Sequence, residues 1–233
     1  MKKTLGLVVI LVVALVAFSG CTGQGADDGK VAGSDYVVEY EGGFLQTFAA
    51  FELTVTGPPQ DLLACIEKGG KLAGRTFLNK EKFSGENAKV QVQLGGSSTF
   101  FEKNDYKIIL RKTDELGKEE GKVVYSRKVK PSPAKLEITG TWFYKDFIPG
   151  TAMTVENTGD LPGEITAIKV IAKKGGGTYP LSVVVPPGGT NVVKTNMFSV
   201  SDEGSVRFTL MTGHSYFGKE YIEVAKFDGK VGT

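Results

Sequence analysis

Side chains that carry catalysis and bind metals are scarce in this chain of 233 residues, which has one histidine and two cysteines. A structural zinc site takes four histidine or cysteine ligands, so these three residues are too few for one. The histidine, His214, is followed directly by Ser215, and neighbours in sequence are poorly placed to be the base and nucleophile of a hydrolase. We therefore predict that His214 lies in the turn or at a strand end of a hairpin, and that the chain has no catalytic residue, metal site or cofactor.

Patterns of paired catalytic acids and of phosphate-binding loops are missing as well. The adjacent acids Asp114–Glu115, Glu119–Glu120 and Asp202–Glu203 lie in stretches with lysine or glycine, which is typical of solvated turns. The glycines of KKGGGTYP (173–180) have neither P-loop spacing nor a helical pattern after them. These features favour a protein that is not an enzyme.

No excess of one charge is present. The chain has 28 lysines and arginines against 26 acids, and Lys2 and Lys3 lie in a segment that we predict to be removed. The remaining chain has 26 residues of each sign. A neutral body gives little electrostatic support for binding nucleic acid, so we expect no such partner.

The longest hydrophobic run lies at the N-terminus. Lys2 and Lys3 precede an uncharged, mostly apolar run from Thr4 to Phe18, the arrangement of a secretory signal. Its end, Phe18-Ser-Gly-Cys21, resembles the lipobox of prokaryotic lipoproteins, with phenylalanine where that family usually has an aliphatic residue. The resemblance implies that residues 1–20 are a signal peptide. It also implies that Cys21 carries a lipid, which would hold the chain on the extracytoplasmic face of the cell membrane, at the cell surface or in the periplasm.

An uncleaved membrane helix is the alternative, because Thr4 to Gly23 is uncharged and about long enough to span a bilayer. Both interpretations export the rest of the chain. Residues 21–34 are rich in glycine, small residues and aspartate, which predicts a flexible tether. Thirteen such residues after the cysteine reach roughly 20 Å on average and about 45 Å at full stretch.

Helical patterns are rare after the tether. The stretch PQDLLACIEKG (59–69) has some helical character, but glycines close to both ends leave it little room. Elsewhere apolar and polar residues alternate, as in KVQVQL (89–94) and SVRFTL (205–210). A period of two predicts strands with one buried face, and therefore an all-β fold.

The body of the chain repeats itself at an offset of about 100 residues. Four pairs of segments occur in the same order: VEYEGGFLQTF with LEITGTWFYKDF, LTV with MTV, YKIIL with VRFTL, and GKVVYSRKV with GKEYIEVAK. A fifth pair, GGSS (95–98) with GGTN (188–191), departs from this offset. Pro131 and Pro133 cannot continue a sheet and predict a short, stiff linker. We predict two tandem immunoglobulin-like β-sandwiches, at residues 35–130 and 131–233.

The second repeat resembles the immunoglobulin-like modules of the CARDB kind, which occur in archaeal and bacterial surface proteins. The matching residues lie at the end of one strand and in a later Pro-Gly turn: Val155, Asn157, Thr158, Gly159, Pro187 and Gly188. Asn157 and Gly159 suit a turn with positive φ, and residues 186–189 suit a second turn. The resemblance implies a fold and no fixed chemistry.

Cys65 is surrounded by Leu62, Leu63, Ala64 and Ile66, and we predict that it is a small buried apolar residue. If Cys21 is acylated, Cys65 has no cysteine left for a disulfide. A Cys21–Cys65 disulfide remains the competing interpretation.

An aromatic cluster, GTWFYKDF (140–147), is the one segment with binding character. Strand alternation places Trp142 and Tyr144 on one face and Phe143 and Phe147 on the other, so one pair faces away from the core unless a bulge at Gly140 changes the register. We favour the interpretation in which Trp142 is a core residue and Phe143 is covered by the first module. In the other interpretation, Trp142 and Tyr144 are exposed and contact a protein or a carbohydrate.

Two functions follow from these observations. The first is a non-catalytic binding or presentation module, anchored to the membrane by a lipid on Cys21. The second is a structural subunit or spacer of a cell-surface assembly, joined to its neighbours by edge-strand pairing. The sequence leaves the oligomeric state open, and a third function, a hydrolase that uses His214 as its base, is disfavoured.

Replacement of Cys21 tests the lipid anchor. Cys21→Ser removes the only sulfur that the lipobox can acylate, so we expect loss of processing or release of the chain from the membrane fraction. Metabolic labelling with a radioactive fatty acid and fractionation of cells measure both effects. Cleavage and membrane retention equal to those of the unsubstituted chain would contradict the lipobox assignment.

Overall fold

The fold is almost entirely β-strand. The computed structural model describes residues 34–45, 48–114, 121–144, 150–172, 175–195, 205–213 and 221–230. Its elements are β1 (Val37–Leu45), β2 (Phe48–Thr56), β3 (Leu62–Lys68), β4 (Lys71–Leu78), η1 (Lys80–Lys82), β5 (Asn87–Gln93), η2 (Ser97–Phe101), β6 (Tyr106–Lys112), β7 (Val123–Val129), β8 (Leu136–Tyr144), β9 (Gly150–Asn157), β10 (Gly163–Ala172), β11 (Gly175–Val185), β12 (Thr190–Thr195), β13 (Val206–Thr212) and β14 (Ile222–Gly229).

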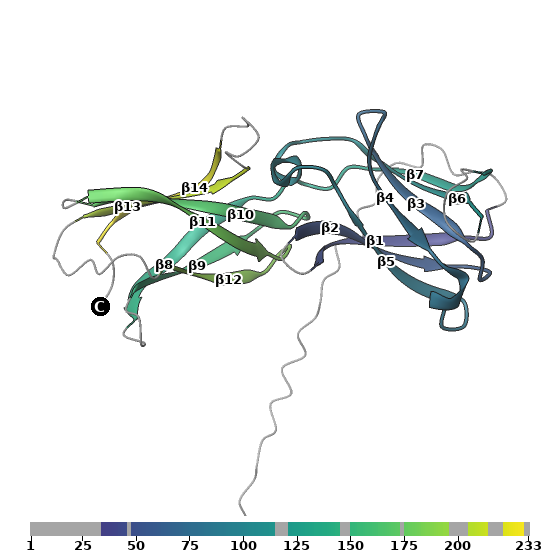
Figure 1. The fold of residues 1–233 in the computed structure, drawn as a ribbon, viewed down its shortest axis with the longest axis horizontal. Helices are drawn as coiled ribbons and strands as arrows, with labels where there is room; N and C mark the ends of the chain where they lie inside the picture. Colours follow the sequence, from purple (N-terminus) through teal and green to yellow (C-terminus); the bar gives the residue numbers. More distant parts are fainter. Residues whose placement is uncertain are drawn as a thin grey trace, which may run out of the picture.

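The strands form two sandwiches with the same topology, which confirms the predicted tandem immunoglobulin-like fold. The first sandwich pairs a sheet of order β1-β2-β5 with one of order β4-β3-β6-β7, and the second pairs β12-β9-β8 with β11-β10-β13-β14. Neighbouring strands are antiparallel. In each sandwich the fourth strand pairs with the third, which differs from constant-type immunoglobulin domains, where it joins the other sheet. Figure 1 shows the sandwiches end to end, with both three-stranded sheets on the lower side.

The shared topology identifies which repeat matches are genuine. The four matched pairs fall on β1 and β8, β2 and β9, β6 and β13, and β7 and β14, which hold equivalent places in their sheets. The fifth match is wrong. Residues 95–98 follow β5, whereas residues 188–191 lead into β12, the equivalent of β5.

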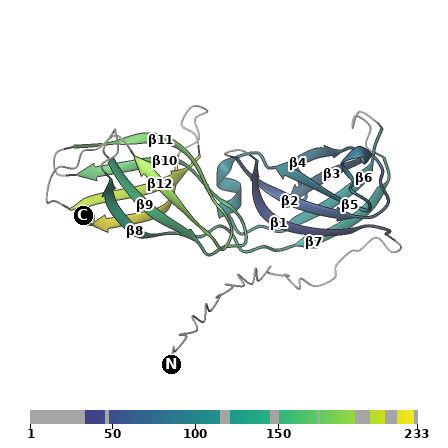
Figure 2. The same cartoon turned by 90° about the horizontal axis from the view of Figure 1, so that it is seen from below.

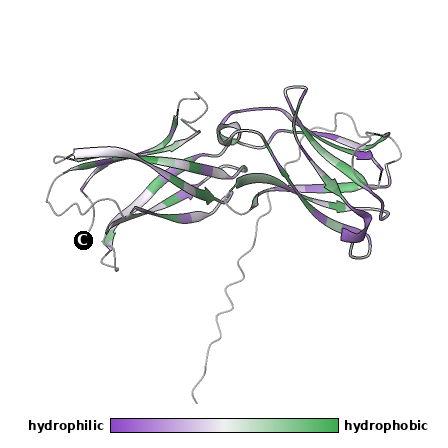
Figure 3. Cartoon of the chain, viewed as in Figure 1, coloured by the Kyte–Doolittle hydropathy of each residue, from purple (hydrophilic) through white to green (hydrophobic). Residues whose placement is uncertain are grey.

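Each sandwich has its own apolar core. Alternate residues of facing strands fill the first core, including Phe51, Leu53 and Ile108, which are completely buried. The second core includes Val155, Ile168 and Phe208, also completely buried. Figure 3 shows the alternation of apolar and polar residues along the strands of both sandwiches.

The segment with weak helical character is β3. Leu62, Ala64 and Ile66 point into the first core, while Leu63 and Cys65 belong to a separate small cluster with Ile109. Both faces are therefore apolar, and a short, continuous apolar run does not distinguish a buried strand from a helix. No helix in the described ranges is long and apolar enough to span a bilayer. The N-terminal residues up to position 33, including Cys21, lie outside those ranges.

The second sandwich inserts a side chain into the core of the first. Leu161, in the turn between β9 and β10, is 1% exposed and belongs to the first core. Gly42 of β1 permits this approach, because a Cβ there would lie 2.7 Å from Pro162 Cδ and 2.5 Å from Pro187 Cγ. A larger residue at position 42 would separate the sandwiches.

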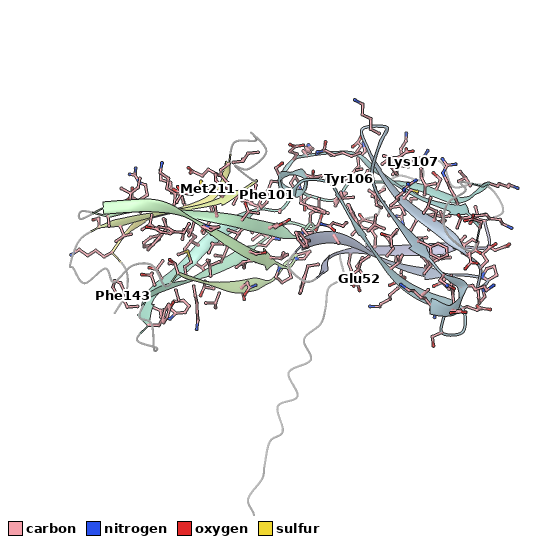
Figure 4. All side chains as sticks on the ribbon, in the orientation of Figure 1. Glu52, Phe101, Tyr106, Lys107, Phe143 and Met211 are labelled. Carbon is pink, nitrogen blue, oxygen red and sulfur yellow. The ribbon has the colours of Figure 1, made fainter. Side chains whose placement is uncertain are left out.

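The first sandwich makes the reciprocal contact. Phe101, at the end of η2, packs against the second core, and η2 lies against β10; Figure 4 labels Phe101 on the side of the first sandwich that faces the second. Next to it, the Ala134 N–H donates to the Phe100 carbonyl (2.8 Å). The joint therefore consists of apolar side chains exchanged in both directions, together with backbone hydrogen bonding.

The linker prolines are held by the same turn that carries Leu161. Both the N–H and the hydroxyl of Ser132 donate to the Asp160 carboxylate (2.8 and 2.6 Å), and the Asp160 N–H donates to the Ser132 carbonyl (3.2 Å). These hydrogen bonds fix the direction in which the chain enters β8.

Asn157 organises this turn in a way that corrects the sequence analysis. It ends β9 and is completely buried, and its amide nitrogen donates to the carbonyls of Leu161 and Val185 (2.8 and 3.2 Å). Its amide oxygen accepts from the N–H groups of Lys135 and Gly159 (both 3.0 Å). Asparagine is therefore required at position 157 because its side chain makes these hydrogen bonds, and not because the backbone has a positive φ.

Gly159 is required because the surrounding backbone leaves no room for a side chain at this position. Its φ is not positive, whereas Gly188 in the predicted Pro-Gly turn has φ +59°. A Cβ on Gly159 would collide with the Pro133 carbonyl and lie 2.9 Å from the Ala134 Cα. The prediction for Gly159 was therefore wrong in its cause, and the prediction of a tight turn at residues 186–189 is confirmed.

Leu161→Ala tests the joint. Because this side chain fills the first core, we expect faster amide hydrogen exchange in β2 and β5, corresponding to a loss of about 2–5 kcal/mol in the free energy of opening. Leu210→Ala, in the second core, is the matched control and should leave exchange in the first sandwich nearly unchanged. Exchange in β2 that stays the same in Leu161→Ala would contradict the insertion.

Candidate functional site

The aromatic cluster of β8 is divided between the core and the surface by a β-bulge. The pairing of β8 with β9 shifts its register between Ile138 and Gly140, the position at which a bulge was considered. Before the bulge, Leu136 and Ile138 pack in the second core; after it, Phe143 does. Trp142 and Tyr144 therefore lie on the outer face of the three-stranded sheet.

The favoured interpretation of Trp142 as a core residue was thus wrong. Trp142 and Tyr144 are each half-buried on that face, and the second core takes Phe143 in place of Trp142. The cover predicted for Phe143 was also misplaced, because Phe143 lies at the end of the second sandwich that points away from the first (Figure 4). Phe147 lies outside the described residues.

Small residues on β9 make room for the two rings. Trp142 is directly opposite Ala152, which is completely buried, and Tyr144 is opposite Gly150. A Cβ on Gly150 would lie 2.6 Å from the Tyr144 hydroxyl oxygen and 2.8 Å from its ring. The Tyr144 ring therefore lies over the glycine, against the backbone of the sheet.

Strand β12 completes the face. Lys194 is opposite Ala152, and its Nζ lies 5.1 Å from the centroid of the Tyr144 ring, a cation–π contact. Val192, two residues before it, is 42% exposed. We name Trp142, Tyr144, Val192 and Lys194 the aromatic face. Sequence reasoning identified its two rings and missed its β12 residues, whose only signal was the alternation in TNVVKT.

The equivalent face of the first sandwich is polar. Its central row is Glu41, Glu52 and Gln91, where the second sandwich has Trp142, Ala152 and Lys194. Gln91 Nε2 donates to Glu52 Oε2 (2.9 Å), and Lys89 lies 3.2 Å from Oε1. The Gln91 amide and, after it, Lys89 hold the pKa of Glu52 below its usual range. The aromatic face is therefore a property of the second sandwich and not of the fold.

The aromatic face is far from Ser34, where the described residues begin. Ser34 donates its hydroxyl to the Val124 carbonyl (2.7 Å) at the start of β7. From there β1 runs toward Gly42 at the joint, and beyond the joint β8 runs from Leu136 to Tyr144. Tyr144 thus lies at the end of the second sandwich that is farther from Ser34, and Figure 2 shows the two sandwiches in line.

The other candidate residues that the structure describes form no second site. Cys65 is a buried thiol, 3% exposed, packed with Leu63 and Ile109, which confirms its predicted burial. In the described part of the chain, no three histidine, cysteine or acidic residues come together as metal ligands. His214 and Cys21 fall outside that part, as do Glu115, Glu119, Glu120, Asp202 and Glu203.

Comparison with known proteins finds likenesses among solved structures and nowhere else. No protein-family model matches the chain, and no curated protein matches it. Among solved structures, a segment of two fibronectin type-III domains from chicken tenascin is similar, with 11% sequence identity and a TM-score of 0.27. The likeness covers 84% of this chain and 98% of the tenascin segment.

Gly150→Ala tests the geometry of the aromatic face. The added methyl group collides with the Tyr144 ring and the Thr195 carbonyl, so we expect the ring to move and Trp142 to be more accessible. Because Trp142 is the only tryptophan, quenching of the intrinsic fluorescence by acrylamide reports on this position directly. Gly140→Ala is the control, since its nearest neighbour, Thr154 Oγ1, is 3.9 Å away. Equal quenching in both variants would contradict the packing of Tyr144 on Gly150.

Proposed function

We propose that this protein is a non-catalytic binding and presentation module of the extracytoplasmic surface, held to the membrane by a lipid on Cys21. The single observation that supports it best is the position of the aromatic face at the end of the molecule opposite Ser34, where the predicted tether joins the first sandwich. In this proposal the two sandwiches hold the face away from the anchor. The resemblance of the second repeat to CARDB-kind modules of prokaryotic surface proteins agrees with such a role.

The composition of the aromatic face supports contact with a partner. A half-buried indole, a tyrosine ring and an exposed valine form an apolar surface beside one lysine. Tryptophan and tyrosine bury much area with little loss of side-chain entropy, which is why they are enriched where partners bind. A protein or a carbohydrate is the proposed partner.

The joint favours a second candidate function, that of a structural spacer. Leu161 and Phe101 fix the sandwiches relative to each other, which a rigid element of a surface assembly also requires. In that case copies of the chain would associate with each other through their edge strands.

Cross-linking from the aromatic face in intact cells distinguishes the two functions. A photoreactive amino acid in place of Val192 lies on the face, and one in place of Val37, which is 61% exposed on the first sandwich, is the control. For a binding module we expect an adduct with a different molecule from position 192 only, and its loss on Trp142→Ala. Electrophoresis and mass spectrometry of the adducts measure this.

Two other results would contradict the binding module. An adduct of two copies of the chain would favour the spacer. No adduct from position 192, or equal adducts from positions 192 and 37, would show that the aromatic face is not the contact.

A further inference from the structure

We propose that the outer face of the sheet β4-β3-β6-β7 lies against the anionic lipid headgroups of the membrane that holds the chain. The inference rests on the membrane attachment in the proposed function. It adds an orientation: the first sandwich rests on the membrane by one face, and the aromatic face of the second sandwich is turned outward.

Four cations share this outer face. Lys107 and Arg111 alternate along β6 with the core residues Ile108 and Leu110. Lys128 is opposite Lys107 on β7, and Arg75 of β4 is opposite Cys65 on β3. We name these four cations and their surroundings the basic face.

Among the described residues of these strands, one carboxylate shares the outer face with the four cations. Glu67 of β3 is opposite Lys107, and the remaining positions of the same rows are uncharged: Leu63, Cys65, Leu72, Phe77, Ile109, Val123 and Ser126. These five side chains, four cations and one carboxylate, together have a net charge of about +3 at neutral pH. Long side chains on this face cover the buried cluster of Leu63, Cys65 and Ile109, which explains why long side chains occur here. Covering the cluster does not explain why almost all of these side chains are positive.

The opposite face of the same sandwich has the reverse charge. The outer positions of β1, β2 and β5 hold Glu39, Glu41 and Glu52 against Lys89. Figure 4 shows Lys107 and Glu52 on opposite sides of the first sandwich. The first sandwich is thus polarised although the whole chain is nearly neutral, so a negatively charged plane attracts one side and repels the other.

The tether ends next to the basic face. Ser34 is hydrogen-bonded to Val124 of β7, the edge strand of the basic sheet. The thirteen residues between the lipid-bearing cysteine and this strand reach roughly 20 Å on average. The basic face is therefore held within reach of the membrane surface, where each lysine or arginine strengthens attachment to anionic lipid roughly five-fold.

This orientation directs the aromatic face away from the lipid. Both three-stranded sheets lie on the same side of the molecule, opposite the two four-stranded sheets (Figure 1). Trp142 and Tyr144 lie on the outer face of β8, which belongs to a three-stranded sheet. When the basic face meets the headgroups, the aromatic face points into the medium.

Lysine footprinting on vesicles tests the inference. The full chain, extracted from membranes of expressing cells, is reconstituted into vesicles of phosphatidylcholine alone or mixed with phosphatidylglycerol. Acetylation followed by mass spectrometry compares Lys107 and Lys128 with Lys89 on the opposite face. We expect labelling of Lys107 and Lys128 relative to Lys89 to fall roughly five-fold in the anionic vesicles. The protection should disappear in 1 M salt, where the Debye length is about 3 Å.

Charge-reversal variants provide the control. Arg75→Glu with Lys128→Glu changes exposed residues and reverses the sign of the face, so Lys107 should lose its protection. In the control variant Lys89→Glu, which changes the opposite face of the first sandwich, Lys107 should stay protected from acetylation.

Flotation separates failure of this inference from failure of the attachment. A chain that floats with anionic vesicles and shows equal labelling on both faces overturns the basic-face orientation and leaves the attachment standing. A chain that does not float with either kind of vesicle overturns the proposed attachment, and this inference with it.

Discussion

The exchange of apolar side chains at the joint is the contact on which the arrangement of the molecule depends. Leu161 is a residue of the second repeat and a member of the first core, while Phe101 belongs to the first repeat and packs against the second core. Without these contacts the two sandwiches would be connected mainly by a short proline-containing linker, and domains with small interfaces move relative to each other by default. Gly42 and Gly159 are glycines because backbone and proline rings approach them closely here.

The second constraint is the bulge in β8, which divides one aromatic run between two environments. Phe143 is needed in the core, and the extra residue near Gly140 brings it there while turning Trp142 and Tyr144 outward. The first sandwich has no register shift in the corresponding pair β1 and β2, and its outer face is occupied by Glu41, Glu52 and Gln91. One topology therefore supports two different surfaces, and the difference arises from a single inserted residue and from small residues at positions 150 and 152.

Much of the fold was predictable because it depends on local patterns. Period-two alternation predicted the strands, and the offset of about 100 residues predicted the tandem arrangement. Residues 59–69 showed some helical character, which was set aside; they contain β3, whose two faces are both apolar. Leu161 could not be assigned to the first core, because a single leucine between Asp160 and Pro162 resembles an ordinary turn. Only part of the aromatic face could be predicted from the sequence. Alternation along β8 identified its two rings, but Ala152 and Lys194 lie beside them because of the register between β8, β9 and β12, which the sequence does not show.

The distance between the two ends of the molecule tests the central claim most directly. Nitroxide labels at Val37, in the first sandwich, and at Ile171, near the far end of β10, occupy exposed positions, and pulsed electron paramagnetic resonance measures the distribution of distances between them. The account predicts a single narrow distribution, which broadens when Leu161 is replaced by aspartate. A distribution that is broad in the unsubstituted chain, or unchanged by Leu161→Asp, would show that the joint does not hold the sandwiches in line.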